Sequence, residues 1–349
     1  VPDTARIADA NITAFTRQAE ARWGRSFADY AALHAWSIDQ PAEFWTSIWE
    51  YGEVKGSRGD VVLEDGDRMP GARWFPGARL NFAENLLRQR DDSDALVFWG
   101  EDRVHNRLSH GDLYRQVAHF AAALTDMGVE PGDRVAAWMP NLPETIVVML
   151  AATSIGAIFS SASPDFGVQG VLDRFGQIEP KVLVAVDGYY YNGKIVDCLD
   201  RLAAITDGLP SVKRVVVVPY VHAKHDLSHV HHARVLAEFV KPFLAETEIP
   251  FVRLPFEHPL YIMYSSGTTG VPKCIVHCAG GVLLQHRVAW SHFGDTWGLP
   301  GGARHAGESA RDGALRELFG RSIRNNFYYV VFVVPLQTTL ALFLAIQVN

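Results

Sequence analysis

The sequence contains little cysteine, with three residues in a chain of 349. Three thiols cannot form the disulfide framework that stabilises many secreted domains, so the sequence fits a reducing compartment. No basic segment followed by an apolar stretch begins the chain, so no secretory signal peptide is visible. The chain also lacks an initial Met, so its first residue need not be the true start. We therefore expect a cytoplasmic protein.

An excess of positive charge is also missing, because 32 Lys and Arg face 39 Asp and Glu, a net charge of −7. This balance is wrong for a protein that neutralises a nucleic-acid backbone, so we expect no nucleic-acid partner. Hydrophobic residues make up 48% of the chain and charged residues 20%, which excludes a disordered protein. The length predicts about two domains.

Charged residues are absent from residues 325–349, and residues 327–348 are mostly apolar. About 20 apolar residues suffice for a helix to span a bilayer. The segment therefore predicts a C-terminal apolar helix that contacts a membrane, which makes a membrane-associated location the alternative to a cytoplasmic one. The other interpretation is a buried strand followed by a buried helix, because residues 328–334 are β-branched and aromatic and Pro335 interrupts them.

From about residue 94, helical and strand-like patterns alternate along the chain. Ser109 and Asp112 form a capping-box signature, and apolar residues at helical spacing follow until Gly128. Residues 182–186 and 214–218 are nearly continuous apolar runs, as in strands that are buried on both faces. The alternation predicts an α/β domain with a mostly parallel sheet flanked by helices.

Residues 1–90 are rich in Trp and show no regular alternation. The apolar spacing from Phe44 to Trp49 predicts a short helix, and a turn at residues 74–82 leads into a second helix at residues 83–88. We interpret residues 1–90 as an N-terminal extension of the α/β domain.

Two groups of metal-binding residue types stand out. The first comprises His222, His225, His229, His231 and His232. The second comprises Cys274, His277 and Cys278. Neither group has further acidic or Cys residues at the spacing of known metal sites. A polar surface loop is therefore the better interpretation of the first group, and packing within a strand that of the second.

One segment has the composition of a phosphate-binding loop. Residues 260–264 predict a buried strand, and residues 265–273 then supply hydroxyl groups, exposed backbone N–H groups at glycine and a cation. The candidate phosphate ligands are Ser265, Ser266, Gly267, Thr268, Thr269, Gly270 and Lys273. The order G-x-x-x-x-G-K-[ST] is not met, which argues against a Walker A kinase or NTPase. A Ser/Thr/Gly-rich surface turn is the alternative.

Residues 264–273 resemble the phosphate-loop signature of the adenylate-forming superfamily, and three other stretches are similar to its acetoacetyl-CoA synthetases. These are residues 74–87 (WFPGARLNFAENLL), residues 128–143 and, above all, residues 154–194. The resemblance covers roughly residues 1–287. It implies an incomplete AMP-binding domain at residues 91–287, with parallel sheets flanked by helices. Acetyl- and propionyl-CoA synthetases are more weakly similar.

The resemblance implies an acid–CoA ligase that uses ATP, Mg²⁺ and coenzyme A. A small carboxylic acid, acetoacetate in this family, would form an acyl-adenylate and pyrophosphate, and the coenzyme A thiol would then displace AMP. By the motif match, the seven candidate ligands would bind the β- and γ-phosphates, with Thr269 nearest the Mg²⁺. His277, Gly280 and Gly281 would help to shape the acyl pocket, although a packed His277 is an alternative interpretation.

The resemblance ends after His286. The expected adenine and acyl pockets, the acidic metal ligand, the ribose-binding Asp and the catalytic Lys of a C-terminal domain are not found. Residues 288–324 then predict a linker or junction, and residues 325–349 resemble the transmembrane start of a sugar ABC-transporter permease. We expect a ligase by descent that is inactive as this chain stands. The alternative is a catalytically silent, truncated or chimeric chain with a membrane-inserting tail.

Overall fold

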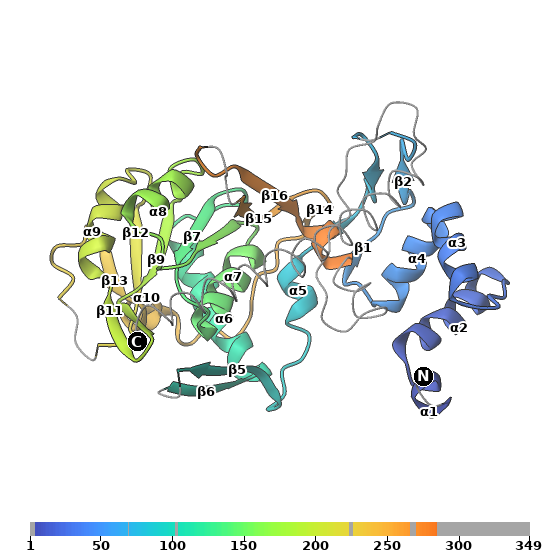
Figure 1. Cartoon of the computed structure of the whole chain (residues 1–349), viewed down its shortest axis with the longest axis horizontal. Coiled ribbons are helices and arrows are strands. Elements are labelled where there is room, and N and C mark those ends of the chain that lie inside the picture. Colours follow the sequence, from blue (N-terminus) through green and yellow to red (C-terminus); the bar gives the residue numbers. More distant parts are fainter. Residues whose placement is uncertain (1–3, 69, 102–103, 223–225, 266–269, 285–349) are drawn as a thin grey trace, which may run out of the picture. The chain divides into compact units, whose positions relative to one another are not determined.

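The computed structural model describes residues 4–68, 70–101, 104–222, 226–265 and 270–284 (Figure 1). These residues form two compact units, one of residues 4–48 with 62–74 and one of residues 49–61 with 75–284. No helix in the described ranges is long and apolar enough to cross a membrane. The predicted linker at 288–324 and the predicted apolar helix at 325–349 lie outside these ranges.

The first unit is mainly helical, and its helices α2 and α3 are not among those that the sequence pattern predicts. Phe44 packs edge-on against Phe15 and Trp36, with ring centroids 5.8 Å apart in both pairs. Asp29 caps one helix by accepting a hydrogen bond from the Ala32 N–H. The helix predicted around residues 44–49 is confirmed as part of α4. The elements are α1 (Thr4–Ala8), α2 (Asn11–Trp23), α3 (Tyr30–Asp39), α4 (Pro41–Tyr51, which ends in the second unit), β2 (Leu63–Glu64) and β3 (Arg73–Trp74).

The second unit contains a seven-stranded sheet in the order β13-β12-β9-β7-β8-β15-β16, and only β16 is antiparallel to its neighbour. The predicted α/β class with a mostly parallel sheet is confirmed. Both continuous apolar runs form strands at the predicted bounds, and their apolar residues are buried. The strands are β7 (Arg134–Trp138), β8 (Ile158–Ala162), β9 (Val182–Val186), β12 (Arg214–Val218), β13 (Ala233–Val235), β15 (Pro259–Tyr264) and β16 (Cys274–Cys278).

Helices connect these strands, and α6 packs on α7 while α8 packs on α9 (Figure 1). The chain passes from β7 to β8 in one direction along the sheet and from β8 to β9 in the other. Right-handed crossovers therefore put α7 on one face and α8 on the opposite face. Ser109 caps α6, as predicted, by accepting from the Asp112 N–H. The helical elements are α5 (Phe82–Leu86), α6 (His110–Asp126), α7 (Pro143–Ser154), α8 (Val168–Phe175), α9 (Leu199–Asp207), α10 (Leu236–Val240) and η1 (Lys241–Phe243).

Short antiparallel pairings that the sequence pattern does not predict complete the second unit. The turns of two hairpins are joined, because the Glu101 carboxylate accepts from the N–H groups of Asn192 and Gly193. The hairpins are β5 (Asp94–Gly100) with β6 (Val104–Ser109) and β10 (Gly188–Tyr191) with β11 (Lys194–Asp197). A further small sheet consists of β1 (Gly56–Ser57), β4 (Arg79–Leu80) and β14 (Leu254–Pro255).

The buried side chain of Asn81 connects three segments of this unit by hydrogen bonds. Its side-chain amide donates to the carbonyl groups of Thr153, Ser154 and Val252, at 3.2, 2.8 and 2.8 Å. Its oxygen accepts from the Glu84 N–H and so caps α5. One side chain therefore joins α5 to the end of α7 and to the segment that precedes β14.

Candidate phosphate-binding site

The predicted phosphate loop, residues 265–273, begins at the carboxyl end of β15. This strand runs parallel to β8, with Tyr261 opposite Phe159, and pairs with β16 through Tyr264 opposite Cys274. In open α/β sheets, ligands bind outside the carboxyl ends of the parallel strands. The loop therefore lies at the edge of the sheet where a ligand is expected.

Two hydrogen bonds join the ends of the loop. The Ser265 N–H donates to the Lys273 carbonyl at 3.0 Å, and the Lys273 N–H donates to Ser265 Oγ at 3.2 Å. Gly270 has φ = +106°, a conformation that side chains rarely adopt, so glycine is required there. Of the predicted ligands, the structure describes Ser265, Gly270 and Lys273. The others, with the predicted Mg²⁺ position, lie outside the described residues: Ser266, Gly267, Thr268 and Thr269.

The two functional groups that the structure describes in the loop are available to an anion. The Lys273 side chain is exposed, and no salt bridge to it is formed within the described part of the chain. Ser265 Oγ acts as an acceptor toward Lys273, so its own proton remains free to be donated. A cation and a hydroxyl donor at one end of a loop can bind phosphate oxygens.

A partly buried tyrosine supports the start of the loop. Tyr264 Oη is hydrogen-bonded to Ser160 Oγ at 3.0 Å, and Ser160 Oγ also donates to the Ile262 carbonyl at 2.8 Å. Burial raises the pKa of the Tyr264 phenol to about 12. The phenol therefore stays neutral at physiological pH and adds no negative charge beside a phosphate. The Arg174 guanidinium lies 5.9 Å from the centre of the Tyr264 ring and makes this region more positive.

The three predicted acyl-pocket residues lie in or just after β16. The His277 ring packs on Tyr261, with centroids 5.4 Å apart. A side chain at Gly280 would lie 2.2 Å from the Phe256 ring, and one at Gly281 would lie 2.8 Å from the sulfur of Cys278. Close packing thus explains both glycines. Their part in an acyl pocket stays a prediction.

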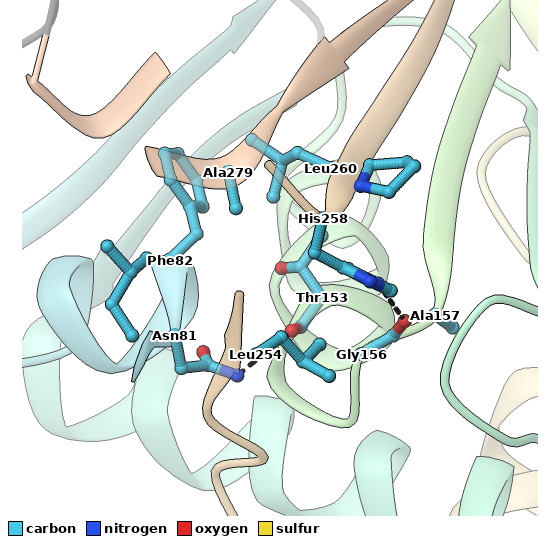
Figure 2. A pocket seen from close by; sticks show the side chains of 11 residues that line it. Asn81, Phe82, Thr153, Gly156, Ala157, Leu254, His258, Leu260 and Ala279 are labelled. Carbon is cyan, nitrogen blue, oxygen red and sulfur yellow. Dashed lines mark hydrogen bonds between the residues drawn. The ribbon is translucent and has the colours of Figure 1, made fainter. Parts of the chain in front are cut away.

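A small cavity lies at the other end of the β15–β16 pair. Figure 2 shows the side chains of Asn81, Leu254 and Leu260 around it, with His258 Nε2 bonded to the Gly156 carbonyl at 2.9 Å. Its volume of about 10 Å³ has room for roughly one water molecule. It cannot hold an organic substrate, and its polar atoms are occupied in joining segments of the chain.

The histidine-rich segment is a surface loop, as predicted. His222 Nε2 lies 2.8 Å from an Asp197 carboxylate oxygen, and both side chains are exposed. His229 and His231 each lie 3.7 Å from another aspartate, while His225 falls outside the described residues. Among the residues that the structure describes, no three His, Cys, Asp or Glu side chains converge as a metal site. Cys274, His277 and Cys278 lie along β16, in agreement with the strand interpretation.

Sequence reasoning missed the residues that support the loop. Ser160 is buried in the middle of β8, and its partners Ile262 and Tyr264 lie more than a hundred positions later in the chain. No local pattern marks such a serine, because its role depends on the order of strands in the sheet. Asp187 was missed for the same reason: its buried carboxylate accepts from the N–H groups of residues 220–222.

Comparison with known families gives matches over most of the chain. Residues 82–305 match the family model described as AMP-binding enzyme, and residues 30–86 match the one described as acetyl-coenzyme A synthetase N-terminus. The first match covers more than half of the chain. It agrees with the resemblance that the phosphate-loop sequence predicts.

Comparison with individual proteins points to the same group. The chain is 52% identical over 287 residues to acetoacetyl-coenzyme A synthetase from Rhizobium meliloti, and 43% identical over 297 residues to acetoacetyl-CoA synthetase from Xenopus tropicalis. Each match covers 82% of this chain and 44% of the relative. The structure of acetoacetyl-CoA synthetase from Streptomyces lividans matches with a TM-score of 0.76 and 41% identity, over 82% of this chain and 44% of that one. The chain thus spans less than half the length of the relatives it matches.

Proposed function

Because the chain belongs to the AMP-binding enzyme family, we propose that it carries the ATP phosphate-binding part of an acetoacetyl-CoA synthetase. The observation that carries this proposal is the 52% identity to an acetoacetyl-coenzyme A synthetase over a region that includes the whole loop. In the proposed reaction the acetoacetate carboxylate attacks the α-phosphorus of ATP and releases pyrophosphate. The coenzyme A thiol then attacks the acyl-adenylate and releases AMP.

We assign phosphate binding to the loop. The exposed Lys273 ammonium and the Ser265 hydroxyl would bind the β- and γ-phosphates together with residues 266–270. Thr269 offers the oxygen type that Mg²⁺ prefers, and a bound Mg²⁺ would neutralise charge on the phosphates. The neutral Tyr264 phenol and the nearby Arg174 favour an anion here. His277, Gly280 and Gly281 remain our candidates for the acyl pocket. The low cysteine content supports a cytoplasmic location.

The acyl substrate has one alternative that a relative's name suggests. The chain is 39% identical over 287 residues to malonamoyl-CoA synthetase from Penicillium aethiopicum, which covers 78% of this chain and 40% of that relative. Malonamate resembles acetoacetate in size, with an amide in place of the methyl ketone. The higher identity to acetoacetyl-CoA synthetases favours acetoacetate.

Nucleotide binding by the full 349-residue chain is the first test. Isothermal titration calorimetry should show that MgATP binds at least tenfold more tightly than adenosine, because only ATP offers phosphates to the loop. Equal affinity for both, or no binding of MgATP, would contradict phosphate binding by this chain.

A domain exchange tests the substrate. Residues 1–287 of this chain replace the matching part of the Rhizobium meliloti relative, and acetoacetate-dependent ATP–pyrophosphate exchange is measured. We expect exchange with acetoacetate to exceed exchange with malonamate or acetate, and to fall when Lys273 is replaced by Ala. A folded chimera that prefers malonamate would overturn the substrate assignment.

A further inference from the structure

Gln177 lies just beyond α8 and contacts the end of the phosphate loop. Its Nε2 donates to the Pro272 carbonyl at 2.8 Å and to the Asp173 carbonyl, and its Oε1 lies 3.7 Å from the Cys274 thiol. Both amide protons and the amide oxygen are therefore engaged. The opposite orientation of the amide would put its oxygen against two carbonyl oxygens, so these partners determine the orientation.

These contacts fall on both neighbours of Lys273. Pro272 precedes it and Cys274 follows it, while its own N–H and carbonyl are bonded to Ser265. One glutamine side chain thus holds the Pro272 backbone through its carbonyl and contacts Cys274 through its thiol. The position of the Lys273 Cα is consequently set by these contacts of its two neighbours together with its own backbone bonds to Ser265.

The helix that precedes Gln177, α8, is anchored by buried side chains. Val171 and Phe175 of α8 are fully buried, and the Arg174 guanidinium lies 3.9 Å from the centre of the Phe166 ring. The Phe175 ring lies 6.4 Å from the Tyr264 ring, at the start of the loop. The segment of α8 and the turn after it therefore contacts the loop at Pro272, through Gln177, and the residue before the loop, through Phe175, although its sequence carries no phosphate-binding motif.

We propose that Gln177 is a positioning residue for phosphate binding, which fixes the Pro272–Cys274 backbone so that the Lys273 ammonium is preorganised toward the nucleotide phosphates. The proposal rests on the proposed function, because it assumes that the loop binds ATP. A side chain that is already held in place loses less conformational entropy when the ligand binds. Preorganised sites gain affinity in this way. Gln177 itself does not touch the nucleotide.

The test compares two glutamines near one helix. Gln177→Met removes the amide at nearly constant side-chain volume. Gln169→Met is the matched control, because Gln169 is also exposed and its amide, within the described residues, bonds the Asp173 side chain and not the loop. In calorimetry with the full chain, we expect Gln177→Met to raise the Kd of MgATP about five- to tenfold, the effect of one or two hydrogen bonds. Gln169→Met should leave the Kd unchanged.

A second measurement does not depend on ATP. Alkylation of Cys274 by iodoacetamide is followed by mass spectrometry of its peptide, with Cys198 as the internal reference, because burial raises the pKa of that thiol to about 12. Loss of the Gln177 oxygen should raise the Cys274 rate about fivefold in Gln177→Met. Gln177→Glu keeps an acceptor but loses both donors, so MgATP binding should weaken without faster alkylation.

The outcomes separate the two proposals. Unchanged Kd and unchanged Cys274 alkylation in a folded Gln177→Met variant would overturn the positioning role, as would equal effects of Gln169→Met. If circular dichroism shows that Gln177→Met is unfolded, the Gln177→Glu variant is used instead. An unchanged Kd of MgATP in that variant would then overturn the positioning role. If the unmodified chain binds no MgATP, the proposed function fails and the phosphate role of Gln177 fails with it. Faster Cys274 alkylation would then show only that Gln177 contacts the Cys274 thiol.

Discussion

Lys273 is the residue of the loop that the structure presents most openly to an anion. Its side chain is exposed, and its backbone alone is engaged with Ser265. The first prediction is that Lys273→Ala raises the Kd of MgATP by about tenfold or more, since a hydrogen bond to a charged group contributes about 1.5–3 kcal/mol. The free energy of unfolding should change by less than about 0.5 kcal/mol, as for other exposed positions. Calorimetry and urea unfolding measure the two quantities.

Lys213→Ala is the matched control for that variant. Lys213 is also exposed, but it precedes β12 and so lies at the amino end of a parallel strand, at the edge of the sheet away from the loop. Its removal should change neither quantity. A Lys273→Ala variant that binds MgATP normally would contradict the phosphate-binding role, and one that unfolds would show that Lys273 has a structural role instead.

His119 predicts how stability depends on pH. It is buried on α6, one ring nitrogen bonds the Leu244 carbonyl, and Nε2 has no partner within the described residues. Burial, with the positive charge of Arg115, lowers the pKa of His119 below 6.5, while the hydrogen bond to Leu244 and the negative charge of Glu246 oppose this shift. The folded state therefore binds fewer protons than the unfolded state, so stability is complete above pH 6.5 and falls as the pH drops below it.

The second prediction is that His119→Gln reduces this acid-dependent loss. Urea unfolding at pH 8 and pH 5 gives the loss for each protein, and the loss should be smaller in the variant because no imidazole has to be protonated in a buried position. If the unmodified protein and the variant lose the same free energy of unfolding between pH 8 and pH 5, groups other than His119 cause the loss.

At the scale of single residues, a site can be proposed from the sequence where the chemistry is local. Lys273 and Ser265 are candidates because hydroxyl, glycine and lysine residues occur together in one short stretch. Gln177, Ser160 and Asn81 were missed because their partners lie far away in the sequence, at Pro272, Ile262 and Val252. A polar residue that bonds backbone groups of a distant segment leaves no pattern in its own neighbourhood.

Among the elements, α6 has the clearest start signal, since Ser109 accepts from the Asp112 N–H at 3.1 Å. The third prediction is that Ser109→Ala lowers the free energy of unfolding by about 1 kcal/mol, the usual contribution of such a cap, as measured by urea unfolding. Ser109→Thr retains a hydroxyl and should recover most of the loss. If the Thr variant is as unstable as the Ala variant, packing at this position matters more than the hydrogen bond.

A helix or strand could be predicted from the sequence when its buried residues form a clear apolar pattern. The strands β9 and β12 match the predicted bounds because continuous apolar runs leave no other assignment. Helix α2 was missed because Phe15 and Ala19 are its only buried residues, too few to produce a helical pattern. The hairpin of β10 and β11 was missed, and its turn is bonded to the Glu101 carboxylate, which lies about ninety positions away in the sequence.

At the scale of the whole molecule, ligand binding and stability are linked, because the loop joins two strands of the central sheet. The fourth prediction is that MgATP at a hundredfold excess over its Kd raises the free energy of unfolding by about 2.7 kcal/mol, the value for a ligand that binds only the folded state. Urea unfolding at increasing MgATP concentration measures this effect. The Lys273→Ala variant should require a higher MgATP concentration for the same gain in the free energy of unfolding. A urea midpoint that does not change with MgATP concentration would argue against binding.

The grouping of chain segments was the least predictable feature at this scale. Residues 62–74 group with the N-terminal helices, whereas residues 49–61 and the segment from 75 onward belong to the unit with the large sheet. A chain that alternates between two units shows no shift in composition at the crossing points. The parallel sheet itself was predictable, because alternating helices and strands are seldom compatible with another arrangement.

The strand order also determines when the loop can form during synthesis. β8 ends at Ala162, but its neighbour β15 begins only at Pro259, after β9, β12 and β13 have been made on the far side of β7. A nascent chain on the ribosome therefore exposes the edge of β8, with Ser160 still lacking its Ile262 partner, until β15 leaves the exit tunnel. The loop and β16 are the last parts of this sheet to be synthesised, so nucleotide can bind only to chains in which the other strands have already been made.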